Sequence, residues 1–318
     1  MKDKILNILK KNGDYISGED MSRTLGISRA AIWKHINNLK KDGYDIISVT
    51  RKGYMLRSAP DVITPDKIYP YLNTRFMARN IKCYKETDST NEAAKSDYSC
   101  PDGTVFISEV QTAGKGRLGR SWLSPRGSGI WMTVLLKPEI PPMDVSQLTL
   151  ISGIALCRAI GGKSKIKWPN DIVIGAKKVC GILTEMSAEA DRINYVVCGI
   201  GINVNTKEFP AELSDKATSI LIETGNKTDR CNLIAKVMNE FEPLYNKYIQ
   251  HGFSSLVDEY KKNCVTLGKE VKVIYRRKEI KGKAIDISST GGLIIDTAEG
   301  ILNITSGEVS VRGLYGYI

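Results

Sequence analysis

Three prolines in about a dozen residues interrupt the sequence early and limit what the chain can fold into. The segment is SAPDVITPDKIYP, residues 58–70. Proline fixes its own φ angle and donates no backbone hydrogen bond, so such a segment continues neither a helix nor a central strand. The 318 residues are enough for two or three domains. We therefore expect a linker here, between a domain at residues 1–60 and a domain at 61–266. A third domain is expected at 267–318, where the pattern changes as described below.

The first of these domains has the pattern of a winged helix-turn-helix. Apolar residues recur at helical spacing near the N-terminus until Gly13, and a second short helix is expected over 19–25. Ser28 is a suitable N-cap for a third helix that runs to about Lys41 and buries Ile32, Ile36 and Leu39. The segment 44–56 then reads as a β-hairpin with a basic tip.

Charge points to DNA as the partner of this domain. Residues 1–60 hold 12 Lys/Arg against 6 Asp/Glu, which is +6 of the total +11. In such a module the second helix of the pair enters the major groove and the wing lies along phosphates. A solvated basic surface or a protein–protein module is the alternative. The expected DNA contacts are Gly18, Ser28, Arg29, Ala30, Trp33, Lys34, Asn37, Arg51 and Lys52.

The rest of the chain predicts an α+β protein. Strand-like runs at 103–111, 129–137, 164–168, 171–175, 178–186 and 193–205 often follow one another without a helix between them. Helices are expected over 89–96, 145–160, 230–250 and 253–262. This order favours a mixed, mainly antiparallel sheet backed by helices. Beyond Leu267, five short β-like runs fit a small SH3-like barrel.

Residue counts exclude several classes of protein. The seven cysteines are odd in number and form no C-x-x-C pair, which indicates reduced thiols and a cytoplasmic protein. Two histidines, His35 and His251, argue against a histidine-built zinc site and a Ser-His-Asp triad. No apolar run approaches the roughly 20 residues that span a bilayer, and the N-terminus does not resemble a signal peptide, so no membrane partner is expected.

The stretch QTAGKGRLGRSW, residues 111–122, matches G-x-G-x-x-G at Gly114, Gly116 and Gly119. A dinucleotide fingerprint needs a helix directly after the glycines, but Pro125 and a second strand follow here. A glycine loop between two strands is instead suited to cover an anionic ligand, and without that ligand it should be mobile. Its cations are Lys115, Arg117 and Arg120.

Four more segments carry residue types that suit an anion site. They are DSTN at 88–91, KWPND at 167–171, KVCGIL at 178–183 with Glu185 close behind, and GIGINV at 199–204. Each alone could be core or turn. Together with the glycine loop, and in this order, they resemble the biotin–protein ligases. With the N-terminal winged helix, essentially all 318 residues resemble the bifunctional ligases that also repress the biotin operon.

The resemblance implies a fold and an activity. The central domain would be similar to the class II synthetases. The enzyme would join biotin and ATP into biotinyl-5′-AMP, with Mg²⁺, and pass the biotinyl group to a lysine of biotin carboxyl carrier protein. As a homodimer carrying biotinyl-5′-AMP as corepressor, the protein would bind operator DNA.

The resemblance also implies residue roles, by position in the motifs. Ser89, Thr90, Asn91 and Gln111 would bind biotin, Lys115, Gly116 and Arg117 would close over it, and Lys178 would bridge carboxylate and phosphate. The nucleotide would meet Arg120, Trp122, Asn170 and Asn203, with Asp171 on the Mg²⁺ side. Lys178 and Arg117 are the expected catalytic residues. Lys115 and Leu118 depart from a family loop that is richer in arginine.

Two other functions remain open at this point. A winged-helix regulator could sense a metabolite without ligase activity, and a lipoate-type ligase has a related fold. The intact KWPND segment and the glycine loop favour a ligase. The DNA-binding end favours the bifunctional protein over a lipoate enzyme.

Overall fold

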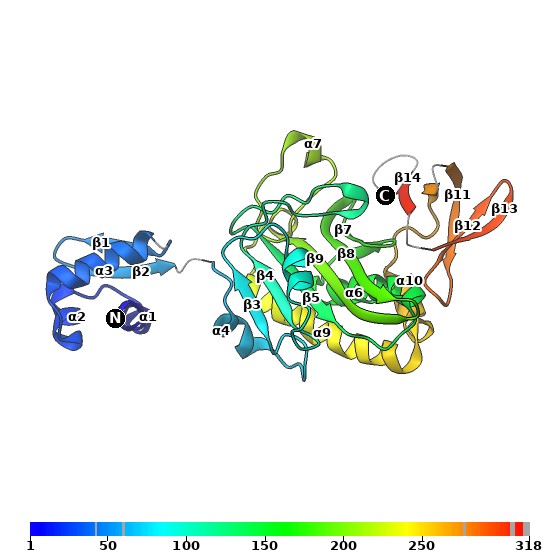
Figure 1. The fold of residues 1–318 in the computed structure, drawn as a ribbon. Coiled ribbons are helices and arrows are strands. Elements are labelled where there is room, and N and C mark those ends of the chain that lie inside the picture. The colour runs from blue at the N-terminus through cyan, green and yellow to red at the C-terminus, as the bar shows by residue number, and fades with distance from the viewer. Residues whose placement is uncertain (42, 59–60, 276–277, 306–308, 314–318) are drawn as a thin grey trace. The chain divides into compact units, whose positions relative to one another are not determined.

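The structure is a computed structural model that describes residues 1–41, 43–58, 61–275, 278–305 and 309–313. Two compact units divide the chain, Met1–Val62 and Ile63–Ile318 (Figure 1). Each unit packs around a hydrophobic core of its own. The division lies within the proline-rich segment for which a linker is predicted. The expected boundary at residue 60 lies outside the described residues.

The N-terminal unit has the three helices and the hairpin that its sequence predicts. Its elements are α1 Lys2–Asn12, α2 Gly18–Leu25, α3 Arg29–Lys41, β1 Asp45–Val49 and β2 Gly53–Ser58. Gly13 ends α1 in the left-handed conformation, with φ of 66°. The Ser28 hydroxyl accepts a hydrogen bond from the Ala31 backbone at 3.2 Å, as an N-cap does. Ile32, Ile36 and Leu39 are buried in the core of this unit, as expected.

The second unit is built on a seven-stranded sheet in the order β3-β4-β5-β9-β8-β7-β6. The strands are β3 Ile81–Tyr84, β4 Val105–Ser108, β5 Gly129–Leu136, β6 Ser164–Lys167, β7 Asp171–Ile174, β8 Lys177–Glu189 and β9 Arg192–Asn203. Only the β3–β4 pair is parallel among the pairings in this sheet. The expectation of a mixed, mainly antiparallel sheet is confirmed, although β3 is an additional strand.

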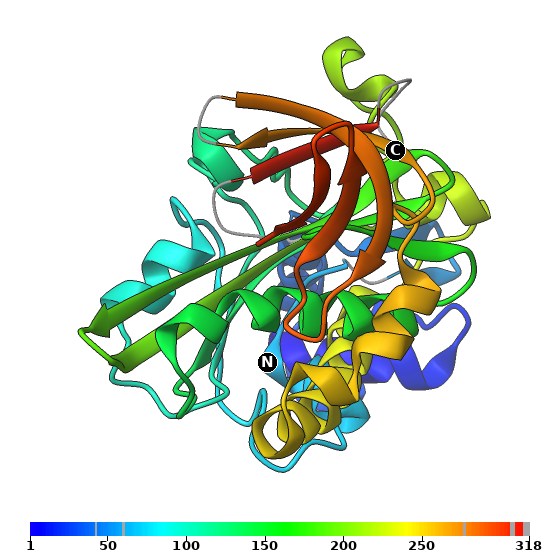
Figure 2. The same ribbon diagram turned by 90° about the vertical axis from the view of Figure 1, so that its right-hand side faces the viewer.

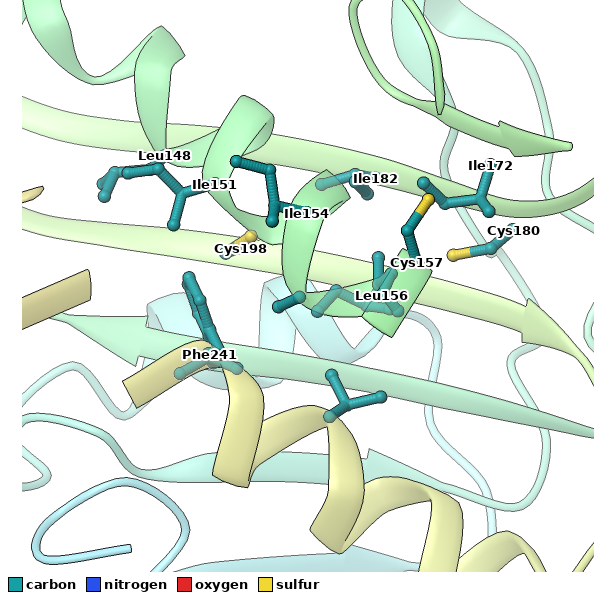
Figure 3. Packing of buried hydrophobic residues seen from close by; sticks show 14 of the residues in the cluster. Leu148, Ile151, Ile154, Leu156, Cys157, Ile172, Cys180, Ile182, Cys198 and Phe241 are labelled. Carbon is teal, nitrogen blue, oxygen red and sulfur yellow. The ribbon is translucent and has the colours of Figure 1, made fainter. Parts of the chain in front are cut away.

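Helices pack against this sheet and form a hydrophobic core with it. They are α4 Pro65–Ile68, α5 Thr90–Ser96, α6 Ser146–Ile160, α7 Ala211–Ser214, α8 Ile220–Thr224, α9 Arg230–His251 and α10 Val257–Asn263. The four predicted helices correspond to α5, α6, α9 and α10, with shifts of a few residues at some ends. Helix α6 lies beside the sheet and beside α9 (Figure 2). Side chains of α6 pack near Ile182 and Cys198 of the sheet and Phe241 of α9 (Figure 3).

The segment that contains helix α6 corrects the expectation that no apolar run approaches the length needed to span a bilayer. Residues 142–160 have a mean hydropathy of 1.3, and their 19 residues are long and apolar enough to cross a membrane by those criteria. The sequence reading found no such run. However, 67% of this window is buried inside the fold, and helix residues from Gln147 to Cys157 are all buried. This segment therefore has the environment of a core helix.

The last strands form a second, five-stranded antiparallel sheet in the order β13-β12-β11-β10-β14. They are β10 Glu270–Tyr275, β11 Lys278–Ile287, β12 Leu293–Thr297, β13 Gly300–Ile304 and β14 Val309–Gly313. These strands, orange to red in Figure 2, curve around one another as the predicted small barrel requires. Their buried residues join the same cluster as those of the large sheet. The boundary at 266/267 stays a prediction.

Candidate active site

The glycine loop connects β4 to β5 and folds back on itself. The backbone N–H of Trp122 donates to the Gly114 carbonyl at 2.8 Å, and the backbone N–H of Gly116 donates to the Arg120 carbonyl at 2.7 Å. One 3-10 turn, Arg117–Gly119, forms the tip, and no α-helix lies in this described stretch between β4 and β5. The dinucleotide fingerprint is thus excluded by geometry, since no helix N-terminus faces the glycines.

Beneath this loop lies a pocket that opens to solvent. The pocket is lined by residues from the start of α5, the loop, the β6–β7 turn, β8 and β9. Most of the ligand residues expected from the motifs meet here: Ser89, Thr90, Asn91, Gln111, Lys115, Gly116, Arg117, Trp122, Asn170 and Lys178. The other lining residues had no expected role: Gly181, Ile182 and Leu183 belong to the KVCGIL segment, Gly199, Ile200 and Gly201 belong to GIGINV, and Met132 of β5 lies outside the motifs.

At one end of the pocket, polar side chains hold one another in fixed positions. Gln111 accepts hydrogen bonds from the Thr90 backbone N–H at 2.8 Å and from the Thr90 hydroxyl at 3.1 Å. The Asn91 amide donates to the Glu185 carboxylate at 2.7 Å. Its oxygen accepts from the Thr133 hydroxyl at 2.6 Å. Sequence reasoning missed Thr133, because only the pairing of strands brings it against α5.

At the other end, cations gather around an indole ring. The Lys178 ammonium lies 2.6 Å from the Asp171 carboxylate and 5.0 Å from the centre of the Trp122 ring. Arg117 donates to the Asn170 side-chain oxygen at 2.9 Å. Burial lowers the pKa of the Arg117 guanidinium from its ordinary value, while the charge of Asp171 opposes this shift. This end of the pocket can therefore receive an anion.

Lys115 points to a different partner, Glu92 of α5. Its ammonium lies 2.7 Å from the Glu92 carboxylate. The hydrogen bonds from Lys115 and, next in size, from Lys95 hold the pKa of Glu92 below its ordinary value. Because Arg117 is bound to Asn170 at the opposite wall, the loop is attached on both sides of the pocket.

Glycines in β8 and β9 make room for the side chains above them. A Cβ atom on Gly199 would lie 2.3 Å from the Asn91 oxygen, and one on Gly201 would lie 2.5 Å from the Trp122 indole. The Trp122 Nε1 is buried and has no hydrogen-bond partner among the described residues. A buried N–H of this kind needs an acceptor, which a ligand oxygen can supply.

Residues 82–203 match the Biotin/lipoate A/B protein ligase family, 2–55 an HTH domain, and 266–312 the Biotin protein ligase C terminal domain. The bifunctional ligase/repressor BirA of Bacillus spizizenii is 39% identical, over 98% of both chains. That of Escherichia coli is 30% identical, over 98% of this chain and 99% of its own.

This chain belongs to the biotin protein ligase family. Among solved structures, the biotin protein ligase from Aquifex aeolicus in complex with biotin and ATP is 35% identical. It matches with a TM-score of 0.67, over 74% of this chain and 99% of its own. The match to the Biotin/lipoate A/B protein ligase family includes every residue that lines the pocket, so the site lies in the ligase domain of this chain.

Three of the expected ligand residues lie outside the pocket lining of this biotin protein ligase. Arg120 is exposed, and Asn203 is buried with its amide donating to the Thr218 carbonyl at 3.1 Å. Asp171 is held by Lys178. No group of three or more His, Cys, Asp or Glu residues that could hold a metal occurs in the described parts of the chain. The roles of these three residues stay predictions.

The N-terminal unit of this ligase-family chain presents most of the expected DNA contacts to solvent. On α3, Trp33 is 60% exposed, Ala30 and Lys34 are exposed, and Asn37 is half-buried. Arg51 and Lys52 are exposed at the hairpin tip, where Lys52 lies over the Tyr15 ring. Ser28 and Arg29 are exposed, and Gly18 is half-buried at the start of α2.

Proposed function

We propose that this protein is an ATP-dependent biotin–protein ligase that also represses biotin genes. The observation that carries the proposal is the pocket under the glycine loop, where the residues of separate motifs meet. Whole-length similarity to bifunctional ligase/repressors supports the second role. The proposed division of labour is DNA binding by residues 1–60, ligation by 61–266, and a supporting C-terminal domain at 267–318.

In the first step, a carboxylate oxygen of biotin attacks the α-phosphorus of ATP. A new P–O bond forms while the bond to pyrophosphate breaks, and no proton has to be removed from the carboxylate. Catalysis then consists of holding two anions together and stabilising the charge that develops. We assign this role to two of the cations that line the pocket, Arg117 and Lys178, of which Lys178 lies over the Trp122 ring.

We assign the two ends of the pocket to the two substrates. Ser89, Thr90, Asn91 and Gln111 would bind the biotin head group. The first three are buried and Gln111 is half-buried, and hydrogen bonds hold Thr90 to Gln111 and Asn91 to Glu185. Lys115 and Gly116 would lie over biotin. The nucleotide would meet Trp122 and Asn170, with Arg120 and Asn203 brought to it from outside the present lining.

We propose that Mg²⁺ binds at this site together with the triphosphate of ATP. Asp171 is the carboxylate closest to Lys178, and Mg²⁺ in nucleotide sites is commonly bound through one or two carboxylates plus phosphates. The residues therefore fit a phosphate-bound ion better than an ion enclosed by protein ligands. When bound, such an ion would supply positive charge beside the phosphates. Asp171 would also keep Lys178 oriented toward the pocket.

In the second step, the ε-amine of a carrier-protein lysine attacks the carbonyl carbon of biotinyl-5′-AMP. A C–N bond forms, the bond from that carbon to the phosphate oxygen breaks, and AMP leaves. A neighbouring hollow shares Arg117, Asn170, Ile182 and Leu183 with the pocket, and offers a path for that lysine. The acceptor would be biotin carboxyl carrier protein.

For repression, two liganded chains would pair and present two winged helices to a palindromic operator. One candidate for the pairing is the edge of β8 that faces away from β9. After Gly181, this edge pairs with no other strand in the described structure. Biotinyl-5′-AMP would be the corepressor. The seven cysteines are all free, in keeping with the cytoplasm as the location that we propose.

Pyrophosphate exchange tests the enzyme against its rivals. Purified protein with labelled pyrophosphate, ATP and biotin should return label to ATP, and lipoate should not replace biotin. Activity with lipoate alone would indicate the lipoate-type ligase, which the central family match also includes. Operator binding without any exchange would indicate the metabolite-sensing regulator. Transfer of biotin to a carrier domain completes the test.

A further inference from the structure

A buried ion pair lies outside the residues assigned to the pocket. Arg230, the first residue of α9, is fully buried, and Glu109, the first residue after β4, is 7% exposed. Two hydrogen bonds join them, at 3.1 Å and 3.4 Å. Charged side chains are rarely buried to this extent, because burial removes their hydration. A buried ion pair at this position therefore indicates a specific structural role.

The guanidinium holds both ends of the glycine loop. Glu109 stands two residues before Gln111, where the chain leaves β4 for the loop. Arg230 also donates a hydrogen bond of 2.9 Å to the carbonyl of Gly129, the first residue of β5, where the chain leaves the loop. Strands β4 and β5 pair with each other up to Ser108 and Trp131, and the Arg230 side chain adds a connection between the two chain segments just beyond this pairing, at the start and the end of the loop.

Each end connects to the pocket by a short path. On the incoming side, Gln111 accepts the hydrogen bonds of Thr90. On the outgoing side, the Trp131 indole donates to the Pro125 carbonyl at 3.4 Å and meets the Trp122 ring edge-on at 6.4 Å between centres. A displacement at either end of the loop would reach groups that line the site.

The same carboxylate also holds the start of the second unit. Glu109 Oε1 accepts a hydrogen bond of 2.7 Å from the backbone N–H of Ile63. Ile63 is the first residue of this unit and follows directly on the segment that comes from the DNA-binding unit. One buried carboxylate therefore contacts the linker end, while its arginine partner contacts the loop exit.

We propose that Glu109 and Arg230 are positioning residues for the glycine loop, and that Glu109 ties the loop to the linker of the DNA-binding unit. Replacing a buried ion pair by apolar residues often leaves stability unchanged or raises it, so stability alone gives weak reason for this pair. The pair instead gives a fixed, directional connection among three backbone segments. The affinity part of this inference rests on the proposed function, and the loop-cleavage part does not.

Two variants test the positioning role in the full-length protein. Arg230→Lys keeps the charge but cannot reach both Glu109 and the Gly129 carbonyl as the planar guanidinium does. Glu109→Gln keeps the size and removes the charge. Both should weaken binding of a non-hydrolysable biotinyl-adenylate analogue by about tenfold or more. Without ligand, both should speed trypsin cleavage in the loop, after Lys115, Arg117 and Arg120, by roughly fivefold or more.

Two controls distinguish a positioning role from a general loss of stability. Arg158→Lys changes an arginine of α6 that binds Glu240 and Glu259 at 39% side-chain exposure, and it should leave loop cleavage and affinity within about twofold of wild type. Cleavage after Lys163, in an exposed turn, should also stay constant. The proposal is overturned if the loop sites stay within about twofold, or if Lys163 becomes sensitive to the same degree.

Wild-type protein provides a measurement that does not depend on the variants folding. Binding of the analogue should slow hydrogen exchange in the peptide that contains Ile63 together with exchange in the loop, by roughly tenfold. A loop that becomes protected while the Ile63 peptide is unchanged would overturn the connection to the linker. Wild-type protein that does not bind the analogue would contradict the proposed function instead, and the cleavage comparison would still decide the role of the ion pair.

Discussion

At the residue scale, the pocket depends on charges that already have partners. Lys178 is bound by Asp171, Arg117 by Asn170, and Lys115 by Glu92. These contacts hold each cation at the pocket while the loop lies over it, so that positive charge is in place where negative charge develops. The motifs identified the cations and Asn170 and Asp171, but not Glu92, whose role depends on how the loop folds onto α5.

Lys178→Ala should impair adenylate formation far more than biotin binding. Its charge matters most as the transition state forms, and loss of one such group typically costs about 2–4 kcal/mol, or roughly 30- to 800-fold in rate. Pyrophosphate exchange and direct biotin binding measure the two effects. Lys177→Ala is the matched control, since Lys177 is exposed and donates to the Ser214 carbonyl. Exchange within about threefold of wild type would remove Lys178 from the mechanism.

The Glu92–Lys115 contact should persist over the whole neutral range of pH. The pKa of Glu92 is lowered in the folded protein, so its contribution to stability is present above the ordinary glutamate pKa of about 4.3 and is lost as pH falls through the lower, folded value. The difference in stability between wild type and Glu92→Gln should thus be constant from about pH 8 to 5 and shrink below about pH 4. Thermal unfolding across this range measures it, and a difference that changes near pH 6 would contradict the assignment.

At the element scale, periodicity predicted most of the fold, because local patterns decide most of its helices and strands. Strand β3 was missed since its four residues, IKCY, are too short to show alternation. The pairing of the strands was not predictable, as it depends on contacts far apart in sequence. For the same reason the motifs predicted most of the polar and charged residues that line the pocket, while the contacts of Thr133, Glu185 and the Glu109–Arg230 pair emerged only from the packed structure.

Close packing between β9 and α5 makes Gly199 a sensitive position. A Cβ atom there would lie 2.3 Å from the Asn91 oxygen, so Gly199→Ala must displace the asparagine. Overpacking of this kind typically costs about 1–3 kcal/mol of stability, and biotin affinity should fall by roughly tenfold or more. Gly153→Ala in α6 is the control, because its Cβ would meet Ile166 at an ordinary 3.5 Å. Unchanged biotin binding in Gly199→Ala would show that Asn91 is not a biotin ligand.

At the scale of the whole molecule, two separate cores predict that the two activities can be separated. Deleting residues 1–58 removes α1–α3 and the hairpin, which pack among themselves. The remaining chain should fold, form the adenylate at saturating biotin, and no longer bind operator DNA. Exchange and gel-shift assays check both outcomes. A folded fragment without exchange activity would show that the division of labour is misassigned.

We expect the ligase and repressor activities to be linked through the glycine loop. Ordering the cationic loop and neighbouring segments around an anionic adenylate lowers the entropic cost of pairing two chains through a strand edge. Ligand binding and dimerisation must then strengthen each other by the same factor. A non-hydrolysable adenylate analogue should therefore raise both the dimerisation constant in sedimentation and the operator affinity at fixed salt, while biotin-free protein should bind DNA weakly. If the analogue changes neither quantity although it occupies the pocket, the loop is only a lid and the repressor does not sense the reaction intermediate.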